Sequence, residues 1–121
     1  MEHRDLTRRY LDAWDRKDIG AVAALLDPAV TFKGPMAATQ GREAFVGAVQ
    51  RMAPLLKGIE VRYLLADDEH AVAVYDFICV EPIGVCRTTE LLGFKGDLIS
   101  SSELFFDARP FEAMLRAPGR G

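Results

Sequence analysis

The sequence predicts an α+β fold, in which three N-terminal helices lie against one face of a mostly antiparallel sheet. In the first half of the chain, apolar residues recur at helical spacing, three or four positions apart. From residue 59 onwards, β-branched and aromatic residues gather in short runs divided by turn residues, which is typical of a strand meander. Twist and bulges would curve such a sheet strongly into a cone around the helices, and the inside of the cone would be an apolar pocket.

The helical part is expected over residues 5–52, with one short strand inside it. Its first helix has Tyr10 and Trp14 on one apolar face. Asp18 has the side chain of a helix N-cap, and Asp27-Pro28 would end the helix that it starts. In chain order the expected elements are a helix over residues 5–17, a helix over 19–26, a strand over 29–32, a loop over 33–40 and a helix over 41–52.

A sheet meander is expected over residues 59–107, within a single domain that spans residues 1–121. Its last two strands would form a hairpin, because Gly96 in Lys95-Gly96-Asp97 can take the positive φ of a tight turn. The other expected elements are strands over residues 59–66 and 70–80, a terminal helical turn over 110–116 and a frayed tail over 117–121.

Composition and charge exclude several classes of function. Charged residues make up 27% of the chain and the formal net charge is −3, without the basic footprint of a nucleic-acid-binding protein. No apolar run approaches the roughly 20 residues of a membrane span, and the first residues lack the apolar segment of a signal peptide. These features predict a soluble, cytoplasmic protein that binds neither nucleic acid nor membranes.

Two cysteines and two histidines are too few, and too far apart, to predict a zinc or iron site. Cys79 and Cys86 lie in apolar, strand-like segments, so two buried thiols are expected, with a disulfide across the connecting turn as the open alternative. No metal and no cofactor is expected.

Glu90 is the first candidate for function. It lies within a predicted apolar strand, and strand alternation places it on one face with Cys86, Thr88 and Leu92. A carboxylate on a dry face must find a partner, keep water or hold its proton. The structural alternative is that the face is exposed, or that Glu90 forms an ion pair with an arginine such as Arg62 or Arg87.

A second group of residues could line the pocket inside the cone. Tyr10 lies on the helix face that would be buried there, and each of the others could equally be ordinary core. The hydroxyls of Ser100 and Ser102 would offer hydrogen bonds to a ligand, with a bulge over Ser100-Ser101-Ser102 as the open alternative. The pocket candidates are Trp14, Phe32, Met36, Phe45, Met52, Tyr75, Phe77, Thr88, Ser102 and Leu104.

The opposite face of the sheet is expected to form a homodimer. Asp76 alternates with Tyr75 and Phe77, so it should point outward when they point into the pocket. The same strand carries further apolar residues that would be hard to leave exposed. They are Val72, Val74, Ile78 and Val80.

Three segments carry a family resemblance. They are RRYLDAWDRKDIGAVAALLDPAVTF, TQGREAF and ELFFDARPF, and they occur in this order between Leu6 and Phe111. The sequence resembles the nuclear transport factor two-like superfamily, and within it the SnoaL-like proteins. The fold that this resemblance implies is the cone-shaped cystatin-like fold. The superfamily includes ketosteroid isomerases, polyketide cyclases and limonene-epoxide hydrolases, so the fold alone does not define the chemistry.

The resemblance to ketosteroid isomerase implies roles for particular positions. Its oxyanion-hole tyrosine falls on Tyr10, and its protonated oxyanion-hole acid falls on Glu90. Its general-base aspartate falls on Gly34, which cannot move a proton, and the aspartate of limonene-epoxide hydrolase falls on Leu104.

Three hypotheses about function follow. The first is a binder of a small apolar or aromatic ligand, whose apolar pocket contains a carboxyl group. The alternative is an isomerase-like or cyclase-like enzyme that uses Tyr10 and Glu90 as oxyanion stabilisers. A dimeric protein-interaction module is the third.

Overall fold

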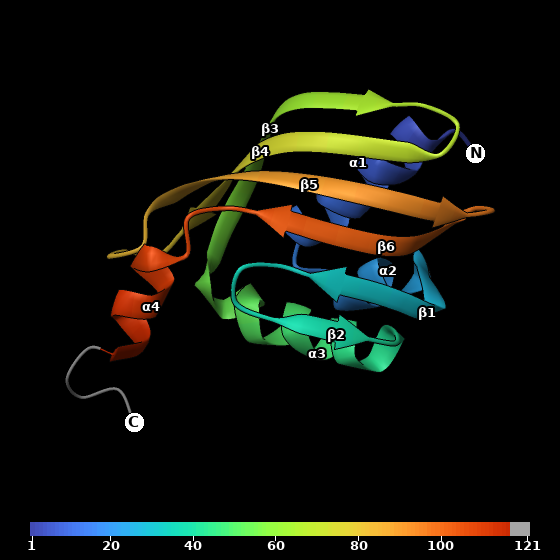
Figure 1. The fold of residues 1–121 in the computed structure, drawn as a ribbon. Helices are drawn as coiled ribbons and strands as arrows, with labels where there is room; N and C mark the ends of the chain where they lie inside the picture. The colour runs from blue at the N-terminus through green and yellow to red at the C-terminus, as the bar shows by residue number, and fades with distance from the viewer. Residues whose placement is uncertain (117–121) are drawn as a thin grey trace.

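The protein forms a curved six-stranded sheet that wraps around its N-terminal helices, as a computed structural model shows for residues 1–116 (Figure 1). The predicted fold class is therefore confirmed. The elements are α1 (His3–Asp15), α2 (Ile19–Ala24), β1 (Leu26–Lys33), β2 (Ala38–Gln40), α3 (Arg42–Met52), the 3₁₀ turn η1 (Ala53–Leu55), β3 (Leu56–Ala66), β4 (His70–Cys79), β5 (Val85–Lys95), β6 (Leu98–Phe105) and α4 (Arg109–Arg116).

The sheet has the strand order β2-β1-β6-β5-β4-β3, and its only parallel pair among the described residues is β1 with β6. Its curvature is helped by irregular pairing. On β5 and β6, Gly93 pairs with Ser101 and Phe94 pairs with Ile99, so Ser100 is left as a bulge. Two further shifts interrupt the pairing of β3 with β4. The ends of the sheet thus bend over the helices.

Two expected boundaries in the helical part were wrong. The second helix ends at Ala24 and β1 begins at Leu26, although Asp27-Pro28 was expected to separate a helix from a later strand. The backbone explains the difference, because Leu26 pairs with Ile99 of β6, whose N–H donates to the carbonyl oxygen of Leu25 at 2.8 Å. Sheet pairing therefore starts before the proline.

The expected loop over residues 33–40 also contains a strand. The three residues of β2 pair antiparallel with the end of β1, through Thr31 with Gln40 and Lys33 with Ala38. A strand this short carries no alternating pattern that the sequence could reveal. The positive φ of 61° at Gly96 confirms the turn expected between β5 and β6. The tail over residues 117–121 lies outside the described residues.

Alternation gives the sheet a buried inner face and a partly exposed outer face. On β5, Cys86, Thr88, Glu90 and Leu92 are buried, whereas the intervening residues are exposed or half-buried. Helix α1 packs against β3 and β4 and buries its predicted stripe against this inner face.

No helix within residues 1–116 combines the length and the apolarity needed to cross a membrane.

Candidate functional site

A cavity of about 240 Å³ lies between the inner face of the sheet and the helices. Of the candidates named from the sequence, only Ser102 is not among its lining residues. Those that line the cavity are Tyr10, Trp14, Phe32, Met36, Phe45, Met52, Tyr75, Phe77, Thr88, Glu90 and Leu104. The fold thus brings side chains from both halves of the chain around one space.

Three hydroxyl groups surround the carboxyl group of Glu90, which is 2% exposed. Tyr75 donates a hydrogen bond to Oε1 at 2.8 Å. Tyr10 donates to Oε2 at 2.8 Å, and Ser102 donates to the same oxygen at 2.5 Å. Ser102 therefore supports the carboxyl group without itself lining the cavity. No cation takes part among these partners, so hydroxyls alone satisfy the buried acid.

Strand register explains why these groups converge on Glu90. Its direct partners across the sheet are Ala73 on β4 and Leu104 on β6, on the same inner face. Tyr75 and Ser102 lie two residues from those partners, so they are the diagonal neighbours of Glu90 on either side. Helix α1 then places Tyr10 over the inner face as the third donor.

The environment raises the pKa of the Glu90 carboxyl group above its ordinary value. Burial is the main cause, because it disfavours the charged form, and the hydrogen bonds from Ser102, Tyr75 and Tyr10 act in the opposite direction. The pKa of Tyr10 and that of Tyr75 are raised well above 10.0, first by burial and then by the charge of Glu90. Both phenols therefore keep their protons and act as donors.

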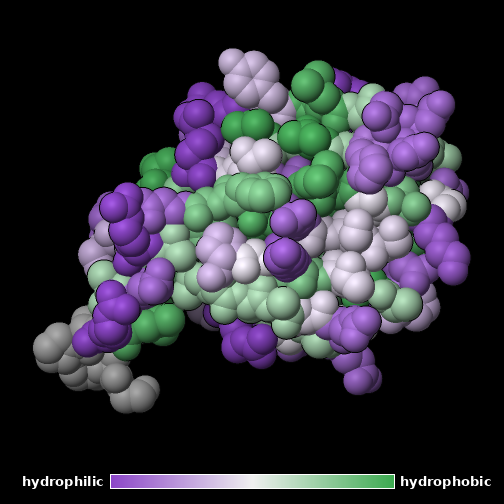
Figure 2. All heavy atoms as spheres, in the orientation of Figure 1, coloured by the Kyte–Doolittle hydropathy of each residue, from purple (hydrophilic) through white to green (hydrophobic). Residues whose placement is uncertain are grey.

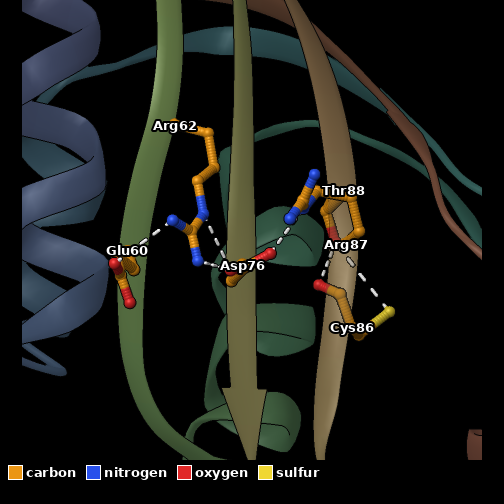
Figure 3. A network of polar contacts seen from close by, with 6 residues as sticks. All are labelled: Glu60, Arg62, Asp76, Cys86, Arg87 and Thr88. Atoms are coloured by element: carbon orange, nitrogen blue, oxygen red, sulfur yellow. Dashed lines mark hydrogen bonds and ion pairs between the residues drawn. The ribbon is translucent and has the colours of Figure 1, made fainter.

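The expected alternative partners of Glu90 bind another carboxylate. Arg62 and Arg87 both contact Asp76, which lies on the opposite face of β4, as predicted (Figure 3). The distances are 2.6 Å from Arg62 Nη2 and 2.5 Å from Arg87 Nε, and Glu60 joins the cluster at 3.5 Å from Arg62. The hypothesis of an ion pair between Glu90 and either arginine is therefore wrong, because the sheet separates them.

The hydroxyl of Tyr75 is the part of the site that sequence reasoning missed. Tyr75 was expected to line the pocket as an aromatic side chain, but not to bond Glu90. Strand alternation already placed Tyr75 and Phe77 together on the inner face. Which residue of β5 lies next to Tyr75 can be known only from the register of β4 with β5. Residues Arg51, Cys86 and Phe111 also line the cavity and were not named as candidates.

Apart from Glu90 itself, no carboxyl or imidazole group lines the cavity within residues 1–116. Gly34 lines it at the position where the resemblance places the base, and a Cβ atom there would lie 3.3 Å from the ring of Phe32. Asp76 is held on the outer face, and Glu103 pairs with Leu91 on that face. Burial raises the pKa of Cys86, so its thiol stays protonated.

Both cysteines are buried and free, so the expected pair of thiols is confirmed over the disulfide. Burial, and next the neighbouring Cys86, raise the pKa of Cys79 to about 11. Neither thiol therefore carries the thiolate that metal binding or nucleophilic attack requires.

We predict that Glu90 makes stability fall as the pH rises. Because its folded-state pKa is raised, the folded state binds a proton more tightly than the unfolded state. The contribution is full below the ordinary value of 4.5 and is lost as the pH rises through the folded-state pKa. Urea unfolding from pH 4 to pH 8 should show wild type losing stability relative to Glu90→Gln.

Asp76→Asn is the matched comparison for this experiment. Hydrogen bonds from Arg87 and Arg62 lower the pKa of Asp76 below 3.8, so its contribution is lost as the pH falls. Between pH 4 and pH 8 the difference in stability between wild type and Asp76→Asn should therefore stay nearly constant, because Asp76 titrates below this range, whereas the difference between wild type and Glu90→Gln should change. A constant difference between wild type and Glu90→Gln across this range would contradict the assignment of a raised pKa to Glu90.

Comparison with known proteins identifies the family. The SnoaL-like domain family matches residues 7–100 of the 121-residue chain. No curated protein sequence matches the chain.

Solved structures support the fold. A protein of Kribbella flavida DSM 17836 has 24% sequence identity, covers 97% of this chain and 96% of its own, and superposes with a TM-score of 0.87. A candidate ketosteroid isomerase of the same organism has 22% identity over 86% of this chain and 76% of its own, with a TM-score of 0.77. A candidate polyketide cyclase of Sinorhizobium meliloti has 19% identity over 84% and 94%, also with a TM-score of 0.77.

Sequence identities this low show a shared fold, but they do not show a shared reaction. The domain match extends over most of the chain, from the helix that carries Tyr10 into β6, where it ends two residues before Ser102. The chain therefore belongs to the SnoaL-like family, within the nuclear transport factor two-like fold.

Proposed function

We propose that this SnoaL-like protein binds a small, largely apolar molecule in the cavity, with Glu90 orienting a polar group of the ligand. One observation carries the proposal. A carboxyl group that is 2% exposed lines an otherwise mainly apolar cavity and is held there by three hydroxyls from three different elements. Small-molecule sites typically combine an apolar lining with a few fixed polar groups.

The size of the cavity favours a small ligand. Drug-sized ligands occupy pockets of roughly 300–1,000 Å³. The cavity here measures about 240 Å³, so a compact single-ring compound fits it better than a fused-ring steroid. The aromatic side chains that line it offer ring faces and edges for such a compound.

An isomerase or cyclase reaction is not favoured. Removal of a proton next to a carbonyl group needs a base within hydrogen-bond reach of the substrate. Gly34 occupies the position of that base, and Asp76 lies on the other face of the sheet. If Tyr10 and Glu90 stabilise an oxyanion, no second carboxyl or imidazole group lines the cavity within residues 1–116 to act as the base. Binding without turnover is the simpler function for this set of residues.

We predict that single-ring compounds raise the thermal unfolding midpoint and change the fluorescence of Trp14. Trp14 is the chain's one tryptophan and lines the cavity, so its emission reports occupancy directly. Glu90→Gln keeps the shape of the side chain and removes its ionisation, so it should weaken the effect of any ligand whose polar group contacts Glu90. If no compound changes either signal in the wild type, the cavity is a packing defect and the proposal is wrong.

We also propose a homodimer through the outer face of the sheet. Apolar side chains there are strongly exposed, with Tyr63 at 67%, Leu65 at 70% and Phe105 at 51%, and Figure 2 shows hydrophobic residues gathered over the sheet. The same face carries both signs of charge, through Arg87 and Glu60. A two-fold interface needs such a self-complementary patch.

The free thiols fit the reducing cytoplasm that we propose as the location.

We predict a dimer in sedimentation equilibrium, and a monomer for Leu65→Asp, because a buried unpaired charge disrupts an apolar interface. Leu115→Asp is the matched control, since Leu115 is 66% exposed but lies on α4 rather than on the sheet. It should remain dimeric. A monomeric wild type at micromolar concentration would overturn the proposed assembly.

A further inference from the structure

The hydroxyl protons around Glu90 determine which kind of ligand atom the cavity can accept. Each hydroxyl has a single proton to donate. The hydroxyls of Tyr10, Tyr75 and Ser102 all donate to Glu90. Three protons therefore point at two carboxyl oxygens. Such an arrangement suits a carboxylate, which accepts about four hydrogen bonds and donates none.

One acceptor position of this carboxylate stays open. Oε2 receives two hydrogen bonds, from Tyr10 and Ser102, whereas Oε1 receives only the bond from Tyr75. Glu90, Tyr10 and Tyr75 line the cavity, so the open position on Oε1 lies next to space that a ligand can occupy. A ligand atom that donates a hydrogen bond can occupy this open position on Oε1 without displacing any of the three hydroxyls.

The surroundings of the cavity favour a positively charged donor. Glu90 and Arg51 are the only lining residues with a charged side chain in the part of the chain described here, and Arg51 is exposed at the end of α3. The lining also carries paired aromatic rings. Trp14 and Phe77 meet edge to face at a centroid distance of 5.8 Å, and Tyr10 and Phe45 do so at 6.5 Å. Aromatic faces attract cations through their quadrupole.

We infer that the cavity binds a protonated amine that carries a small apolar body, with its N–H donating to Oε1 of Glu90. This inference rests on the proposed function and names its ligand class. A buried ion pair is stable only where further hydrogen bonds satisfy the remaining lone pairs, and the three hydroxyls already do so here. While Glu90 is ionised, a ketone would have to break one of these hydrogen bonds to gain a donor, because a ketone offers only acceptors.

Three ligands of similar size separate the possibilities by isothermal titration calorimetry at pH 7. Benzylamine is a cationic donor, benzyl alcohol is a neutral donor and acceptor, and acetophenone is an acceptor alone. Wild type should bind benzylamine about tenfold or more tightly than either of the others, which is the smallest difference that a buried charge pair normally produces. Because this comparison uses only wild type, it does not depend on any variant folding.

Two variants locate the effect. Glu90→Gln should lose most of the preference for benzylamine, so that the three affinities agree within about threefold, a difference well below 1 kcal/mol. Glu103→Gln removes one negative charge from the outer face of β6, where Glu103 pairs with Leu91, and should leave benzylamine binding unchanged. Circular dichroism checks that both variants are folded.

The outcomes distinguish this inference from the proposed function. If acetophenone or benzyl alcohol binds wild type as tightly as benzylamine, or if Glu90→Gln keeps the preference, the amine assignment is wrong and the cavity still binds ligands. If no compound binds here or in the wider ligand screen, both proposals fail. If Glu90→Gln and Glu103→Gln lose benzylamine affinity equally, the preference comes from the net charge of the protein, and the amine assignment is wrong.

Discussion

The burial of one carboxyl group is the constraint on which the interior of this protein depends. Removing a charged carboxylate from water costs several kcal/mol even after relaxation of its surroundings. Here hydroxyls from α1, β4 and β6 offset that cost by donating to Glu90. Because each donor must stay within hydrogen-bond reach, the acid fixes the position of the first helix over the sheet.

Two acids on neighbouring strands show how the faces of the sheet set side-chain chemistry. Asp76 points outward, where Arg62 and Arg87 hold it as an anion and lower its pKa. Glu90 points inward, where burial raises its pKa and only hydroxyls reach it. A one-residue shift in register would exchange these environments and leave each acid with the wrong partners. The two sites therefore also define the register of β4 and β5.

Alternation along β4 and β5 was sufficient to predict the inner face, the outward direction of Asp76 and the inward direction of Tyr75 and Glu90, because side-chain direction in a strand has a period of two. The hydrogen bond from Tyr75 to Glu90 could not be predicted, since it depends on strand register. Nor could the early start of β1 at Leu26, which comes from pairing with Ile99, more than seventy positions along the chain. The local sequence pattern thus predicted which face of the sheet a side chain occupies, whereas pairing between distant segments determined which residue it contacts.

The most direct test of this account is a ¹³C NMR titration of the Glu90 side-chain carboxyl group, assigned by its absence in Glu90→Gln. The account predicts a midpoint above the range around 4.3 that is usual for glutamate, because the group is desolvated in the cavity. A midpoint at or below that ordinary value would contradict it. Glu90 would then be solvated, or paired with a cation, and the cavity would not be organised around a buried acid.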